Sequence, residues 1–492
     1  MFSISGTKHL ISAGSGIHKQ RLNVKMPDVS ACLAAATFLL ISIIPFYFSN
    51  DAQPKPYMDE IFHVPQAKRF CDGNYSYWDP MITTLPGLYI ISVVLLKPLS
   101  LILPQTQDVC STHNLRAVNL LFMSGNMFLL YLIIKKIHVN NKMISNSTLV
   151  LNAWTLAFFP VLYFFSGMYY TDPGAVCFTL LMYYLNLNGN HFASAIFGVV
   201  AIVFRQTNII WVLFVLGLTK GRQLIIWMEQ EKKDITRMTD LRTLITLFNL
   251  IFKSVRHKPS RIFELILAIF KSTWCYIAVV IGFITFVFIN GGIVVGDKSH
   301  HQACLNFPQI FYFLCVTLAF SCMHIASPSK IVYFLKFSFQ SPVKVSVFVL
   351  LAYYLIANYT YVHEYLLADN RHYPFYVWSK IFKRHENVKY GLIVVYLFAA
   401  IAVSKALENK DVFWKIVFLI CLCACSIPQK LLEFRYFIIP YLIFRVNITI
   451  TSKFKLLVEL LLYISINFLT FYIFIQKTFK WSDSDDLQRF MW

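Results

Sequence analysis

Long apolar runs separated by short polar segments dominate the hydrophobic pattern of this chain. About 20 consecutive apolar residues are enough for one α-helix to cross a bilayer. The runs lie at 31–48, 116–134, 147–164, 174–187, 192–204, 207–218, 265–289, 305–325, 345–362, 390–404, 412–427, 436–449 and 456–476. Several of these runs are shorter than a straight crossing requires. They favour a tightly packed bundle with a locally thinned bilayer or with helices that cross only half of it. The pattern predicts an all-α polytopic membrane protein with roughly 12–14 transmembrane helices.

Two stretches leave the number of crossings open. Lys97 and Pro98 interrupt the apolar stretch 86–104, so we expect it to lie beside the membrane rather than to cross it. Residues 373–382 fit either a very short crossing or none. The side of the membrane that holds the C-terminus therefore stays open as well.

Basic residues predict the orientation of the bundle. The N-terminal segment 1–30 is polar and basic and precedes an apolar run without a clear cleavage site, which indicates a retained signal anchor with a cytosolic N-terminus. The segment 219–261 holds ten Lys or Arg against four Asp or Glu, so we expect a cytosolic insertion there. Within it, 241–252 has helical apolar spacing suited to a membrane surface.

With this orientation, the polar loops that carry candidate chemistry share the opposite, lumenal or external face. These loops lie at 49–115, 166–173, 290–304 and 363–389. The sequence has no internal repeat and no soluble domain, so residues 31–492 are expected to form one membrane domain. A scaffold without chemistry has no need to gather its polar loops on one side.

Composition excludes several classes of function. The chain is 57% hydrophobic and 14% charged, with a formal net charge of +20. Lys and Arg next to anionic lipid explain that charge, and no soluble basic domain exists to bind nucleic acid. There is no Walker A loop, no glycine-rich dinucleotide fingerprint, no zinc-protease motif and no nucleophile elbow. The eleven cysteines are scattered, and Cys421, Cys423 and Cys425 lie within one apolar run, as packing residues do.

The first polar loop holds the most concentrated candidate chemistry. Asp59 and Glu60 are adjacent, and His63 follows one helical turn after Asp59. On a helix, Asp59 and His63 share a face while Glu60 points about 100° away, so one carboxylate alone faces a given cleft. Trp78 and Asp79 follow, and aromatic residues suit sugar stacking as well as membrane interfaces. These residues alone fit a catalytic role and a capping or ion-pair role equally well.

Five sequence blocks resemble a known family. The first runs from Pro56 to Gly87, with Tyr-Met-Asp-Glu-Ile-Phe-His followed by Trp-Asp-Pro and Thr-Thr-Leu-Pro-Gly. The others lie, in order, at 204–208, 296–302, 367–373 and 429–436. Together they resemble the endoplasmic-reticulum α-1,2-glucosyltransferases that complete the dolichol-linked oligosaccharide. Each block is weak evidence alone, whereas five in order across most of the chain are specific.

The resemblance implies a polytopic glycosyltransferase of the GT-C class with a lumenal active site in the endoplasmic-reticulum membrane. Dolichyl-phosphate-glucose would be the donor, and the acceptor would be the dolichyl-diphosphate oligosaccharide that already bears two glucoses. A β-linked donor and an α-1,2 product imply an inverting single displacement with one carboxylate as general base. Related transferases need no divalent metal, so neither metal nor other cofactor is expected.

Roles for individual residues follow from the resemblance. Asp59 is expected to be the general base, with Glu60 as the alternative or as a group that holds acceptor hydroxyls. His63, Trp78 and Asp297 are further substrate-binding candidates. Asp79 and Asp172 suit sugar hydroxyls, although each also precedes a proline as a turn residue does.

Cationic residues are candidates for the donor phosphate. Arg371 and His372 are the first choice, and an ion pair of Arg371 with Asp369 or Glu364 is the alternative. Arg205 is expected to have an anionic partner. Arg435 either pairs with Glu433 or binds phosphate. Adjacent His300 and His301, near Asp297, favour hydrogen bonding within their loop over a metal site. A secondary transporter and a structural or regulatory membrane subunit remain the alternative functions.

Overall fold

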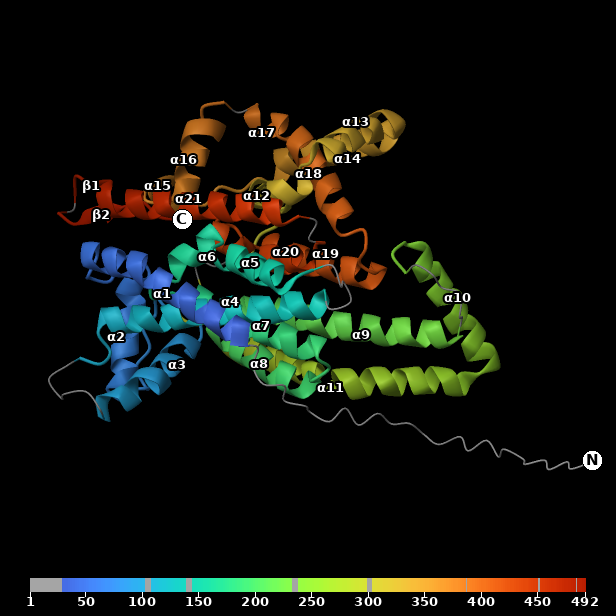
Figure 1. Ribbon diagram of the computed structural model, residues 1–492, viewed down its shortest axis with the longest axis horizontal. Helices are drawn as coiled ribbons and strands as arrows, with labels where there is room; N and C mark the ends of the chain where they lie inside the picture. Colours follow the sequence, from blue (N-terminus) through green and yellow to red (C-terminus); the bar gives the residue numbers. More distant parts are fainter. Residues whose placement is uncertain are drawn as a thin grey trace, which may run out of the picture.

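The computed structural model describes residues 29–101, 108–138, 144–231, 238–298, 303–385, 387–449, 452–483 and 485–492. Figure 1 shows that most of the long helices run along the longest axis of the molecule. The strands in the described residues form one small C-terminal hairpin, from β1 (Thr478–Lys480) and β2 (Leu487–Arg489). The prediction of an all-α polytopic membrane protein is confirmed.

Within the part of the chain that the structure describes, eight helical segments are long and apolar enough to cross a membrane. They contain α1 (Val29–Ala52), α4 (Thr112–Ile137), α9 (Ile209–Glu231), α11 (Pro259–Asn290), α12 (Pro308–Ile325), α14 (Pro342–Tyr359), α18 (Ile393–Ala406) and α21 (Lys453–Gln476). Each matches a run predicted from the hydrophobic pattern. The total of 12–14 crossings stays a prediction, because the other apolar runs form shorter helices.

The other apolar helices are shorter than these eight segments. They are α3 (Gly87–Leu96), α5 (Asn146–Ala157), α6 (Pro160–Phe165), α7 (Asp172–Leu187), α8 (His191–Phe204), α19 (Val412–Ser426) and α20 (Ile438–Asn447). Among them, α7 and α8 fill their predicted runs. The run 147–164 is split because Pro160, which lacks an N–H, starts α6 instead of continuing α5. Helix α3 ends at Leu96 and is followed by η1 (Lys97–Leu101), at the position where the sequence predicted an interruption.

The remaining elements connect or cover the bundle. They are α2 (Glu60–Cys71), η2 (Gln206–Asn208), α10 (Arg242–His257), α13 (Pro328–Gln340), α15 (Glu364–Ala368), α16 (Tyr373–Tyr376), η3 (Val377–Phe382), α17 (Val388–Gly391) and η4 (Phe434–Phe437). The predicted surface helix near 241–252 is α10, whose Leu241, Phe248 and Phe252 side chains are exposed. The hydrophobic pattern did not predict α13, and 373–382 holds only two short helical turns.

A buried ion pair fixes the start of α2 within the bundle. Arg116 of α4 donates from Nε to Glu60 Oε1 at 2.8 Å and from Nη2 to Oε2 at 2.5 Å. The Glu60 carboxylate also accepts from the backbone N–H groups of Tyr57 and Tyr169, at 3.0 and 2.6 Å. Glu60 is 0% exposed and Arg116 2%. Four hydrogen bonds therefore compensate the charge of this carboxylate inside the protein.

The same guanidinium ties α4 to the end of α1. Its Nη1 donates to Asn50 Oδ1 at 3.0 Å and to the Gln53 carbonyl at 2.6 Å. Its Nη2 reaches the Lys55 carbonyl at 3.2 Å. The pair thus joins α1, α2, α4 and the segment before α7, all of which surround the loop that carries Asp59.

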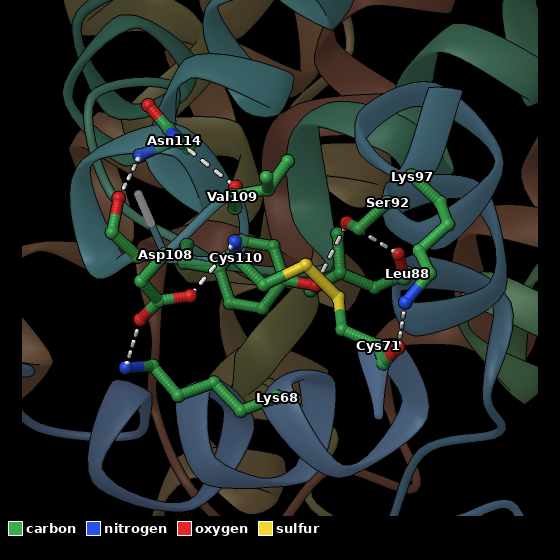
Figure 2. The surroundings of a disulfide bond; sticks show 11 residues. Lys68, Cys71, Leu88, Ser92, Lys97, Asp108, Val109, Cys110 and Asn114 are labelled. Atoms are coloured by element: carbon green, nitrogen blue, oxygen red, sulfur yellow. Dashed lines mark hydrogen bonds and ion pairs between the residues drawn. A yellow bond between two sulfur atoms is a disulfide. The ribbon is translucent and has the colours of Figure 1, made fainter. Parts of the chain in front are cut away.

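A disulfide closes the loop after α2. Cys71, the last residue of α2, is bonded to Cys110, just before α4 and 39 residues further along the chain. Figure 2 shows the contacts around it: Lys97 Nζ donates to the Cys71 carbonyl at 2.8 Å, and Asp108 pairs with Lys68 at 2.8 Å. Reading the cysteines as packing residues missed this bond, although Cys421, Cys423 and Cys425 are free as expected.

We predict that Glu60→Gln destabilises the protein by about 3–5 kcal/mol, because it leaves the Arg116 charge buried without its counter-ion. The midpoint of thermal unfolding, followed by tryptophan fluorescence in detergent, measures the effect. Asp108→Asn is the matched control: its pair with Lys68 is exposed, and such pairs contribute less than about 1 kcal/mol. A Glu60→Gln midpoint equal to that of wild type would refute the structural role of the pair.

Replacing both Cys71 and Cys110 with Ser should lower stability by about 3–4 kcal/mol, because a closed loop of this length restricts the unfolded chain. Cys32→Ser, which removes an exposed free thiol, should leave the unfolding midpoint unchanged. Peptide mapping under non-reducing conditions should recover Cys71 and Cys110 in one cross-linked product. Free thiols at both positions in purified protein would contradict the assignment.

Candidate active site

Asp59 stands at the entry to α2 and faces a cavity. The residue before it, Met58, has φ +56°, the only positive value at a non-glycine position among the described residues. This turn starts α2 so that Glu60 points into the protein, while the Asp59 side chain keeps 45% of its surface accessible. The two neighbouring carboxylates therefore face different surroundings, as the helical spacing predicted. The Asp59 backbone N–H donates to the Tyr170 hydroxyl at 3.3 Å.

Arg435 is the central cation of the site. It belongs to η4, and its Nη1 lies 3.3 Å from Asp59 Oδ2 and 3.8 Å from Asp172 Oδ2. Its Nη2 lies 2.8 Å from Glu433 Oε2. Arg205, directly after α8, pairs with the other oxygen of Asp172. Three carboxylates and two guanidinium groups thus form one network from four separate parts of the chain.

The network determines the charge states around Asp59. Enclosure by protein alone would raise the pKa of Asp59, but the Arg435 guanidinium and His63 outweigh it and lower the pKa below the ordinary value. For His63, burial lowers the pKa more than Asp59 raises it, so its imidazole is neutral at pH 7. Burial lowers the pKa of Arg435, but the nearby carboxylates outweigh burial and raise this pKa above its ordinary value, so the guanidinium stays charged. At neutral pH the cavity therefore presents an ionised carboxylate beside a permanent cation.

A second cluster lies on the segment after α15. The Arg371 guanidinium donates to both oxygens of Asp369, from Nε at 2.9 Å and from Nη2 at 2.8 Å. This is the ion pair that the sequence offered as the alternative role of Arg371. His372 Nε2 lies 3.9 Å from the same carboxylate, and His372 Nδ1 lies 2.8 Å from the Trp492 carbonyl oxygen.

Two adjoining cavities meet at Asp59. They share six residues in their walls: Asp59, Tyr170, Tyr365, Leu431, Glu433 and Arg435. One cavity, of about 320 Å³, adds Arg371, His372, Trp492 and apolar side chains that include Leu366. The other, of about 390 Å³, adds His63, Thr83, Thr84, Arg205 and Asp297. Asp59 and Arg435 thus line both a cavity that combines Arg371 and His372 with apolar side chains and a cavity that adds hydroxyl groups and a further carboxylate.

Four predicted site residues are not in the walls of these cavities: Glu60, Trp78, Asp79 and Asp172. Glu60 is 0% exposed and bonded to Arg116. Trp78 packs against aromatic neighbours and donates from Nε1 to the Ile82 carbonyl at 3.2 Å. Asp79 caps a turn by accepting from the Met81 N–H at 2.9 Å, which is its alternative role.

The other predicted residues gather at the cavities. His63, Arg205, Asp297, Arg371, His372, Glu433 and Arg435 line their walls, and Asp172 joins the Arg435 network from a buried position. His300 and His301 lie outside the described residues. Sequence reasoning missed Tyr170 and Trp492, which also line the site. Tyr170 lies in a predicted polar loop, whereas no sequence signal pointed to the C-terminal tail.

Within the part of the chain that the structure describes, no group of three His, Cys, Asp or Glu side chains is placed to hold a metal ion. A larger cavity of about 900 Å³ lies elsewhere, lined by α13, α14 and α18 residues that include Tyr333, Lys344 and Lys405. It contains none of the predicted site residues. The candidate chemistry is therefore concentrated in the two smaller cavities.

Several known proteins that are similar to this chain over most of its length carry the same name. A rat protein named Dol-P-Glc:Glc(2)Man(9)GlcNAc(2)-PP-Dol alpha-1,2-glucosyltransferase is 47% identical over 471 residues, which cover 93% of this chain and 98% of that protein. A human protein of the same name is 47% identical over 94% of this chain and 98% of its own length. An Arabidopsis thaliana protein of that name is 33% identical, over 94% and 99%.

No solved structure matches the chain. The family model described as the DIE2/ALG10 family matches residues 53–446, a range that contains all five sequence blocks. The resemblance deduced from those blocks is confirmed. The chain is a member of the DIE2/ALG10 family.

Proposed function

We propose that this protein transfers glucose from dolichyl-phosphate-glucose, in α-1,2 linkage, to the dolichyl-diphosphate oligosaccharide that already carries two glucoses. The names of its relatives describe this reaction. The observation that carries the proposal is the position of Asp59, an ionised and accessible carboxylate where two cavities meet. A transferase needs such a group because the base must contact the acceptor hydroxyl while that hydroxyl faces the anomeric carbon of the donor. Neither alternative, a transporter or a structural subunit, agrees with those names.

The proposed chemistry is one inverting displacement. The acceptor hydroxyl oxygen attacks the anomeric carbon of glucose while Asp59 takes the hydroxyl proton. The new C–O bond forms as the bond from the anomeric carbon to the phosphate oxygen breaks, and dolichyl phosphate leaves as an anion. Arg435, 3.3 Å from Asp59, keeps the base ionised and supplies positive charge beside the reacting groups. Residues of this chain alone account for every proton in this step.

The two cavities suit different substrates. Arg371 and His372 give the first cavity hydrogen-bond donors for a phosphate, and Leu366, Leu432 and Pro374 give it apolar surface for an isoprenoid chain. Thr83, Thr84 and Asp297 give the second cavity hydroxyl and carboxylate groups suited to sugar hydroxyls. We assign the first to the donor and the second to the acceptor. Asp172 then lies between the two arginines, paired with Arg205 through one oxygen and 3.8 Å from Arg435 through the other.

The proposed site faces the lumen of the endoplasmic reticulum, and the N-terminus is cytosolic. The disulfide beside α2 supports this orientation, because disulfides form in oxidising compartments such as that lumen. The basic insertion supports it as well: Figure 1 shows α10 at the opposite end of the molecule from α2 and the β-hairpin. Positive charge collects on the cytosolic side of membrane proteins.

Asp59→Asn should reduce glucose transfer by at least about 100-fold, because the amide cannot accept the hydroxyl proton. Donor binding should change little, since Asn occupies the same space. Transfer of labelled glucose from dolichyl-phosphate-glucose to the diglucosylated acceptor by purified protein measures the first effect. Asp72→Asn, the same change at an exposed position of the same loop, is the control. Wild-type rates for Asp59→Asn would remove Asp59 as the base.

Replacing Arg435 with Gln should move the acid limb of the pH–rate profile to higher pH. Arg435 is the main group that lowers the pKa of Asp59, and enclosure by protein, which raises that pKa, would then dominate. A base with a raised pKa is protonated, and inactive, at pH values where the wild-type carboxylate is still ionised. The profile is measured between pH 4 and 8 with rates normalised to each maximum. Superimposable profiles would show that Asp59 ionisation does not limit the rate.

A further inference from the structure

The C-terminal segment after α21 returns to the proposed donor cavity. Residues 478–480 and 487–489 pair as the antiparallel hairpin β1–β2, and the chain then continues to Trp492 in the cavity wall. Figure 1 shows the hairpin at the same end of the molecule as α2 and α15. Neither the family model, which ends at residue 446, nor the predicted site residues include this segment.

Arg489 anchors the segment to α1, α21 and the loop before Asp59. Its Nη1 donates to the Phe474 and Ile475 carbonyls at 2.8 and 3.0 Å, and its Nη2 donates to the Ala52 carbonyl at 2.6 Å. Its backbone N–H donates to the Tyr57 hydroxyl at 2.8 Å, and that hydroxyl donates to the Arg489 carbonyl at 2.7 Å. Tyr57 is two residues before the proposed base. These hydrogen bonds therefore hold the C-terminal segment at a fixed position relative to Asp59.

The residues on either side of Arg489 hold the proposed phosphate-binding groups. Gln488 accepts from Arg371 Nη1 at 3.1 Å through Oε1. The Met491 N–H donates to the Arg371 carbonyl at 2.9 Å, and the Tyr373 N–H donates to the Met491 carbonyl at 3.2 Å. The Trp492 carbonyl lies 2.8 Å from His372 Nδ1. Side chain and backbone of the Arg371–His372 pair are thus bonded to one short segment, residues 488–492, which begins in β2.

The hairpin also limits the rotation of the Arg371 side chain. The Trp481 ring lies under its guanidinium, 4.6 Å from the ring centroid, and the Trp481 Nε1–H donates to Asn370 Oδ1 at 2.9 Å. Together with Asp369 and Gln488, this ring encloses the guanidinium on several sides. An arginine held in one orientation loses less conformational entropy when a phosphate binds than a free arginine does.

We propose that the C-terminal strand positions Arg371 and His372 for the donor phosphate, with Gln488 and Arg489 as positioning residues that do not themselves take part in the reaction. The inference rests on the proposed function, because it assigns the phosphate to the cavity that these two residues line. Gln488 acts on the donor through Arg371, and Arg489 sets the distance between this strand and the segment of Asp59. Gln488 therefore affects donor binding and leaves the acceptor side unchanged.

The test compares kinetic constants of the full-length protein in nanodiscs. Gln488→Ala removes the support of Arg371 and leaves the Arg489 anchor intact. It should raise the KM for dolichyl-phosphate-glucose and the inhibition constant of dolichyl phosphate by about five- to tenfold, the effect of one typical lost hydrogen bond. The KM for the acceptor and the midpoint of thermal unfolding should stay at wild-type values. Lys480→Ala, an exposed change in the same hairpin, should match wild type throughout.

Arg489→Lys tests the anchor, since lysine keeps the charge and loses most of the four hydrogen bonds that the guanidinium donates to the Gln53 side chain and to the Ala52, Phe474 and Ile475 carbonyls. It should raise the same two constants more than Gln488→Ala does. The inference is overturned if Gln488→Ala leaves both donor-side constants within twofold of wild type, or if it raises the acceptor KM equally or lowers the unfolding midpoint. Absence of glucose transfer by wild-type protein would instead overturn the proposed function.

Discussion

The buried pair of Glu60 and Arg116 is the interaction on which the site depends. Placing two charges away from water costs several kcal/mol per ion unless hydrogen bonds replace the lost hydration. Here the carboxylate accepts four hydrogen bonds, and the guanidinium also donates to groups at the end of α1. Because these partners come from four parts of the chain, they fix the first turn of α2. Asp59, one residue earlier, can then point only into the cavity.

Two adjacent carboxylates consequently have opposite tasks. Glu60 is fully compensated and holds the structure together, whereas Asp59 has one guanidinium neighbour and an open side. Arg435 is shared among Asp59, Asp172 and Glu433, so its charge is not neutralised by any single partner. A cation placed beside the base in this way keeps the Asp59 carboxylate ionised. The arrangement suits a reaction in which an anion leaves next to the base.

Hydrophobic periodicity and sequence blocks predicted much of the molecule. Apolar runs predicted the long helices because a membrane requires about 20 such residues whatever their partners are. The sequence blocks indicated Asp59, Arg371 and Arg435 as candidate site residues because these three residues lie in short segments that resemble the family. The geometry of a helix also separated Asp59 from Glu60, although it did not say which one faces the cavity.

Other features depend on contacts between distant segments, which no local pattern encodes. Arg116 opens a predicted apolar run and gave no sign of pairing with Glu60, 56 residues earlier. The spacing of Cys71 and Cys110 did not predict their bond, and Tyr57 meets Arg489 across 432 residues. Trp78 and Asp79 share a block with Asp59, but local packing turns them away from the cavities.

The position of a bound donor tests the account most directly. An electron cryomicroscopy structure of the protein with dolichyl-phosphate-glucose should show the phosphate within hydrogen-bonding distance of Arg371 or His372. The glucose should lie beside Asp59, with its anomeric carbon open toward the cavity that holds Thr83 and Asp297. Density for the donor phosphate in the second cavity, or at a site away from Asp59 with both cavities empty, would contradict the assignment.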